Sequence, residues 1–175
     1  DPPTRATRVS NWVVARNVSV AAIPSQSPAS ILDSSNIPAA FGHGTMVAGI
    51  VHLVAPHAMI LPLKAFTADG SSTTFDIVRA IYYAVDHGAK VINMSFSTTQ
   101  ESPQLKAAMD YAVKKGVILV AAAGNDGKAA QAWPASSANV MGVASTNNSM
   151  TRHMISSVGD PLISLPAPVA CHGQV

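Results

Sequence analysis

The chain has 175 residues, of which 48% are apolar and 11% are charged, and its formal net charge at pH 7 is +2. This length and composition are typical of one globular domain, or part of one, that can bury a core. The 11 Lys and Arg residues are scattered, which argues against a nucleic-acid or membrane-surface partner, and the single cysteine, Cys171, excludes an intrachain disulfide.

The first 40 residues are rich in Pro, Ser and Asn. They predict an irregular lead-in, residues 1–40, with strand-like runs at 12–15 and 18–23 that Pro24 and Pro28 interrupt.

From Phe41 onward, helical and strand patterns alternate. Gly88 and Gly116 are expected to end two of the helices, and Ser102 is expected to cap the start of the second of these. The expected elements, in order, are a helix after residues 42–45, a strand at 59–65, a turn at 69–70, a helix at 74–87, a strand at 89–97, a helix from Ser102 to Gly116, a strand at 117–123 and a final strand at 140–145.

The strand at 117–123 is continuously apolar, which is typical of a parallel strand covered on both faces. It is also the longest apolar run, and it is far too short to span a bilayer. The alternation of strands and helices predicts an α/β fold with a three-layer, mostly parallel sheet and helices on both faces. Its ligand site should lie beyond the carboxyl ends of the strands.

Three segments carry polar side chains to this expected site. His43 lies between two glycines at the start of an apolar helix, where an imidazole can face a cleft. Gly124 and Asn125 end the strand at 117–123, so the amide of Asn125 should project from the ligand edge. The strand at 90–97 turns polar at its end and reaches the same edge.

These segments resemble the subtilisin-like serine peptidases. The resemblance rests on Gly-His-Gly-Thr-x-Val-Ala-Gly at residues 42–49, Val-Ala-Pro at 54–56, Ala-Asp-Gly-Ser at 68–71 and Ala-Ala-Gly-Asn at 122–125, with a variant of the Ala-Pro-Gly segment at 165–168. It covers about residues 41–170 and implies that residues 41–175 form a partial subtilisin-like catalytic domain.

The resemblance implies roles for individual residues. His43 would be the general base of a serine endopeptidase with an Asp-His-Ser triad, and Asn125 would donate its side-chain amide to the oxyanion. Ser95, Phe96 and Ser97 would form the edge that pairs with an extended peptide or protein substrate, with Gly124 nearby. The family usually has Leu-Gly-Gly or similar after this serine, so residues 96–98 depart from its pattern.

The other two members of the triad are not found in the family's patterns. No Gly-Thr-Ser segment is present, and Ser149 lacks its glycine and precedes no predicted helix. No Asp-Ser/Thr-Gly segment is present either, and Asp33, ten residues before His43, is its nearest counterpart without the glycine. The 175 residues alone are therefore expected to be inactive.

The carboxylates are dispersed without metal-ligand spacing, so neither a metal nor another cofactor is expected. His52, His57 and His87 are interpreted as surface or capping residues. The resemblance favours a secreted or extracytoplasmic location.

Two alternatives stay open. One is a catalytically inactive subtilisin-like module that binds peptides without turnover. The other is a short-chain dehydrogenase that binds a nicotinamide cofactor, because Tyr111 and Lys115 have the Tyr-x-x-x-Lys spacing. The glycines around His43 do not follow the dinucleotide-binding spacing, which argues against the second alternative.

Overall fold

The computed structural model describes residues 12–15, 42–67, 69–125, 131–146 and 163–168. Six strands form one sheet in the order β2-β1-β3-β4-β5-β6. Their bounds are β1 Trp12–Ala15, β2 Leu61–Lys64, β3 Val91–Met94, β4 Ile118–Ala122, β5 Val140–Thr146 and β6 Ile163–Pro168. β3 to β6 pair in parallel, whereas β1 lies antiparallel to both of its neighbours.

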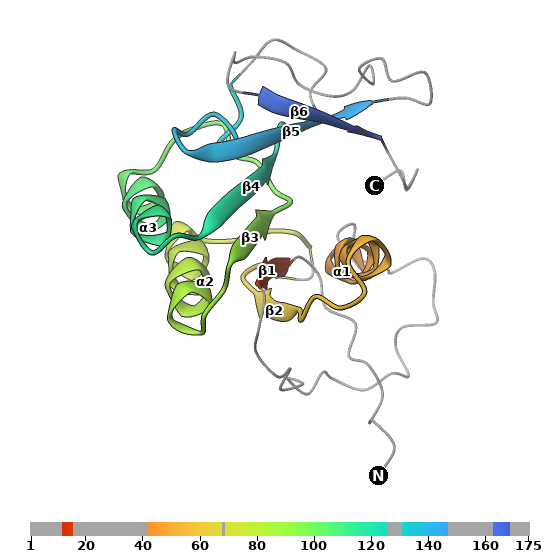
Figure 1. Cartoon of the computed structure of the whole chain (residues 1–175). Helices are drawn as coiled ribbons and strands as arrows, with labels where there is room; N and C mark the ends of the chain where they lie inside the picture. The colour runs from red at the N-terminus through yellow and green to blue at the C-terminus, as the bar shows by residue number, and fades with distance from the viewer. Residues whose placement is uncertain (1–11, 16–41, 68, 126–130, 147–162, 169–175) are drawn as a thin grey trace.

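Three helices flank the sheet: α1 His43–Val54, α2 Thr74–Asp86 and α3 Pro103–Lys114. α2 and α3 lie together on one face, and α1 lies on the other face beside β1 (Figure 1). The predicted α/β architecture, with helices on both faces of a mostly parallel sheet, is confirmed.

The helix boundaries follow from local sequence signals. Thr73 and Ser102 accept hydrogen bonds from the backbone N–H groups of Asp76 and Leu105, which would otherwise lack helical partners. Gly88 and Gly116, which follow α2 and α3, have φ angles of 79° and 76°, a region that strongly favours glycine. The predicted Ser102 cap is confirmed.

The core lies between the sheet and the pair α2 and α3. Ile81 on α2 is fully buried against strand residues Ile92, Met94 and Leu119. Each such side chain contributes about 1.5–3 kcal/mol through removal from water. This packing fixes the ends of β3 and β4, beyond which the candidate site residues lie.

The expectation that β4 is covered on both faces is wrong. Its burial alternates, with Leu119 and Ala121 at 1% exposure and Ile118 at 54% exposure. α3 covers one face of β4 only. The continuous apolar run at residues 117–123 therefore does not indicate burial on both faces.

The strand at residues 140–145 is not the final strand of the sheet. β6 follows it and pairs with it in parallel, over residues that were expected to lie after the last strand. Pro166 and Pro168 lack backbone N–H groups and argue against a strand, but β6 is at the sheet edge, where a missing donor is tolerated.

The run at residues 12–15 forms β1, as predicted, and inserts between β2 and β3. The second run of the lead-in, at 18–23, lies outside the described residues. The division of the chain at residue 40 stays a prediction.

Candidate active site

α1 presents His43 at its first residue. Gly42 precedes it with φ 80° and ψ −6°, a left-handed conformation that lets the chain turn into the helix. The imidazole is partly buried, and its Nε2 lies 3.2 Å from the main-chain oxygen of Ser95. The structure thus joins two of the predicted site residues, which are 52 positions apart in the sequence.

This contact orients the imidazole. A carbonyl oxygen can only accept a hydrogen bond, so this contact is a hydrogen bond when Nε2 of His43 carries a proton. Within the described part of the chain, no hydrogen bond reaches Nδ1. The contact therefore holds the imidazole against the segment that follows β3, whichever ring nitrogen carries the proton.

Ser95, Phe96 and Ser97 directly follow β3. Asn93 Nδ2 donates to Ser95 Oγ over 2.8 Å, which fixes the start of this segment. The ring of Phe96 packs against that of Phe66, with centroids 5.0 Å apart and an interplanar angle of 51°. The segment is thus anchored to the loop that leaves β2.

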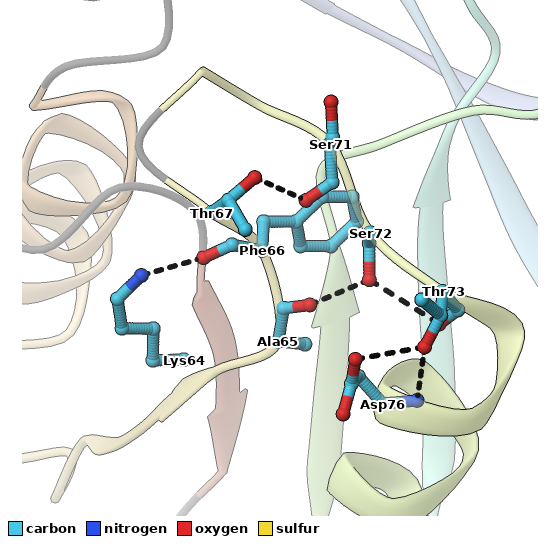
Figure 2. Close-up of a pocket in the computed structure, with 8 residues that line it drawn as sticks. All are labelled: Lys64, Ala65, Phe66, Thr67, Ser71, Ser72, Thr73 and Asp76. Carbon is cyan, nitrogen blue, oxygen red and sulfur yellow. Dashed lines mark hydrogen bonds between the residues drawn. The ribbon is translucent and has the colours of Figure 1, made fainter.

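That loop contains a pocket that the sequence did not reveal. The pocket has a volume of about 350 Å³ and lies between the end of β2 and the start of α2 (Figure 2). It is lined by Lys64, Ala65, Phe66, Thr67, Ser71, Ser72, Thr73 and Asp76. The Asp-Gly turn in this loop was predicted, but no local pattern indicated a cavity.

Gly124 and Asn125 follow β4 at the same edge of the sheet. β3 and β4 are parallel, and Met94 pairs with Ala121, so both strands end at the same level. Gly124 is buried with φ 89°, and Asn125 is exposed. No hydrogen bond joins Asn125 to His43 in the described residues. The two residues therefore lie at the same edge of the sheet without a hydrogen bond between them.

A further segment that the sequence did not indicate borders this edge. Thr98 N–H donates to the oxygen of Trp133 over 2.7 Å, and Trp133 N–H donates to the oxygen of Thr98 over 3.0 Å. Ser137 Oγ also donates to Oε1 of Glu101 over 3.4 Å. The segment around Trp133 is therefore tied to the chain that continues from Ser97.

The remaining candidate residues fall into two groups, those outside the described residues and those on the surface. Asp33 and Ser149 lie outside the described residues. His52 and His57 are exposed, and His87 is the C-cap of α2, as expected for surface and capping residues. The described residues contain no group of three His, Cys, Asp or Glu side chains placed to hold a metal ion. No helix among them is long and apolar enough to cross a membrane.

The family follows from comparison with known proteins, because a sequence profile of the subtilase family matches residues 22–173. The chain belongs to the subtilase family. It is 38% identical to thermitase of Thermoactinomyces vulgaris over 137 residues, which cover 73% of this chain and 49% of thermitase. It is 37% identical to subtilisin DY of Bacillus licheniformis over 134 residues, which cover 69% of this chain and 49% of that protein.

Solved structures agree with the subtilase assignment. A lanthipeptide protease superposes with a TM-score of 0.68 and 28% identity, over 75% of this chain and 44% of that one. Sphericase superposes with a TM-score of 0.60 and 30% identity, over 65% of this chain and 44% of its own. The chain spans about half the length of the relatives that it matches, so it corresponds to a partial domain.

The assignment removes the dehydrogenase alternative. In this subtilase, the Tyr111 hydroxyl donates to Asp86 over 3.1 Å, and Lys115 Nζ lies 5.6 Å from the centre of the Tyr111 ring. Tyr111 and Lys115 thus belong to a surface cluster on α2 and α3.

Proposed function

We propose that this subtilase is a serine-type endopeptidase in which His43 is the general base and Asn125 the oxyanion donor. The observation that carries the proposal is the placement of His43, at the start of α1, against the main chain of Ser95 at the carboxyl edge of the sheet. A base at this position can face a substrate that pairs with the segment 95–97.

The chemistry requires a nucleophile whose proton passes to Nε2 of His43 and then to the leaving amine. For this, Nε2 must release Ser95 and accept, which requires the imidazole proton to be on Nδ1. A carboxylate acceptor at Nδ1 favours that tautomer, as in the triad. We propose that the aspartate and the serine come from sequence beyond these 175 residues.

The substrate would be an extended peptide or protein segment. Main-chain hydrogen bonds along residues 95–97 would hold it, with loose side-chain preference. Asn125, which is exposed after β4, would donate its amide to the developing oxyanion, and loss of one such donor costs about 10²–10³-fold in kcat.

A fluorophosphonate probe tests the proposal, because it labels a serine that a general base activates. The full gene product and the 175-residue chain are compared, each with His43→Ala and with the control His87→Ala, which alters an exposed histidine remote in sequence from the edge. We expect labelling of the full product and of its His87→Ala form only. Labelling that survives His43→Ala would contradict the role of His43.

The second candidate is a peptide-binding module without turnover. The sequence favours it, because residues 1–175 contain neither a Gly-Thr-Ser segment nor an Asp-Ser/Thr-Gly segment. A full gene product that binds unfolded polypeptide but takes up no probe would establish this candidate.

A further inference from the structure

The loop at residues 66–72, here called the 66–72 loop, lies at the same edge of the sheet as the candidate site. It leaves the carboxyl end of β2 and ends before Thr73, the cap of α2. Because β2 and β3 are both antiparallel to β1, they run parallel to each other. Their carboxyl ends therefore meet at one edge, where Ser95 also lies.

The 66–72 loop touches the proposed substrate segment through one pair of rings. Phe66 at its start packs against Phe96, which follows β3. Both rings are partly buried and contact the hydrophobic core. A change in the path of the loop would therefore be passed to the segment 95–97.

The exposed carboxylate of Asp69 contacts two other described residues of the 66–72 loop, of which residues 66–67 and 69–72 are described. That carboxylate accepts hydrogen bonds from Thr67 Oγ1 and, over 3.1 Å, from the N–H of Ser71. The same two residues are joined by the backbone, where Thr67 N–H donates to Ser71 oxygen over 2.8 Å. Asp69 thus bridges the two sides of the loop.

The ends of the loop are held separately. Ser72 Oγ donates to Ala65 oxygen, and Lys64 Nζ donates to Phe66 oxygen over 2.7 Å (Figure 2). Gly70 at the tip has φ 87°, and a glycine there offers the least intrinsic restraint. Gly70 N–H donates to Thr67 oxygen over 3.2 Å, so Asp69 adds a side-chain bridge to a turn that the backbone also closes.

We propose that Asp69 is a positioning residue for peptide binding: it braces the turn between Thr67 and Ser71, which directly follows the Phe66–Phe96 contact beside the substrate edge. The inference rests on the proposed function of that edge. Ordering one residue costs about 1–2 kcal/mol, and preorganisation removes this cost from the binding step. Asp69 should then affect substrate affinity, with no direct part in the chemistry.

The test uses Asp69→Ala, Asp69→Asn and the control Asp110→Asn. Asp110 is also an exposed carboxylate, and it pairs with Lys106 on α3. Fluorescence anisotropy measures the affinity of each protein for fluorescein-labelled β-casein, an unfolded polypeptide. Hydrogen exchange measures the protection of the peptide that contains residues 66–72.

We expect Asp69→Ala to weaken casein binding about three- to tenfold, the effect of one net hydrogen bond, and to accelerate exchange in the loop. Asp69→Asn keeps an acceptor oxygen and should lie between Asp69→Ala and the unchanged chain. Asp110→Asn should change neither readout.

Unchanged affinity in Asp69→Ala, with normal binding by the unchanged chain, would overturn the role of Asp69 and leave the proposed function standing. Absence of casein binding by the unchanged chain would overturn the substrate edge itself, and the inference with it. Unchanged exchange in Asp69→Ala would overturn the ordering of the loop, whatever the affinity.

Discussion

Asp86 and Tyr111 show how one hydrogen bond sets the chemistry of a surface side chain. The phenol donates to the Asp86 carboxylate, and this bond raises the pKa of Tyr111 above its ordinary value of 10.0. A donor bond to a carboxylate stabilises the protonated phenol, so Tyr111 is less able than a free tyrosine to act as a base. This is the reverse of what a catalytic tyrosine needs.

Replacement of the acceptor tests this effect. We expect Asp86→Asn to lower the pKa of Tyr111 toward 10.0, because the amide is an uncharged acceptor. The ultraviolet absorbance of the phenolate, followed against pH, measures the change after subtraction of the Tyr111→Phe titration. Asp76→Asn, at the other end of α2, is the control and should leave the titration unaltered.

At the scale of single residues, the sequence predicted the residues that are marked by a pattern of a few neighbouring positions. His43 could be found because its glycines and its helix are adjacent to it, and Ser102 because a cap is a pattern of a few positions. The bridge between Thr98 and Trp133 joins residues 35 positions apart and leaves no local pattern. The same holds for the 5.0 Å contact of Phe66 with Phe96.

At the scale of elements, α3 illustrates a boundary that the side chains fix. Ser102 Oγ accepts from the N–H of Leu105, whose side chain is 3% exposed. We expect Ser102→Ala to lower the free energy of unfolding by about 1 kcal/mol, because the N–H loses its partner. Urea denaturation measures the change.

Thr99→Ala is the matched control for Ser102→Ala, since Thr99 is an exposed hydroxyl residue just upstream of the helix. It should change the unfolding free energy by less than about 0.5 kcal/mol. Equal destabilisation by the two substitutions would mean that the cap does not stabilise α3.

The strands were harder to predict than the helices. The register of β1 depends on pairing with β2 and β3, about 50 and 80 positions away, and a four-residue run contains no information on those partners. β6 was missed because its prolines oppose a strand, and only its place at the edge makes them tolerable. Long-range pairing, and not propensity, decided both elements.

At the scale of the whole molecule, the two faces of the sheet differ in cover. The face toward α2 and α3 is buried, whereas the opposite face exposes apolar side chains on adjacent strands. Val91 pairs with Ile118, and Val120 pairs with Met141, so these side chains adjoin on that face. Val91, Ile118 and Met141 are 38%, 54% and 37% exposed.

An apolar group of this kind favours association of the isolated chain. We expect the 175 residues alone to bind 1-anilinonaphthalene-8-sulfonate and to form oligomers as concentration rises, in sedimentation velocity. Ile118→Thr should reduce both effects with little change in unfolding free energy, because the side chain is already exposed.

Ile92→Thr provides the matched comparison, since Ile92 is an isoleucine of the neighbouring strand β3 that is 0% exposed, on the face toward the core. It should lower the unfolding free energy by about 2 kcal/mol or more, through the lost apolar contacts and the buried hydroxyl, without reducing association. If Ile118→Thr destabilised the chain as much as Ile92→Thr, the second face would be packed and not open.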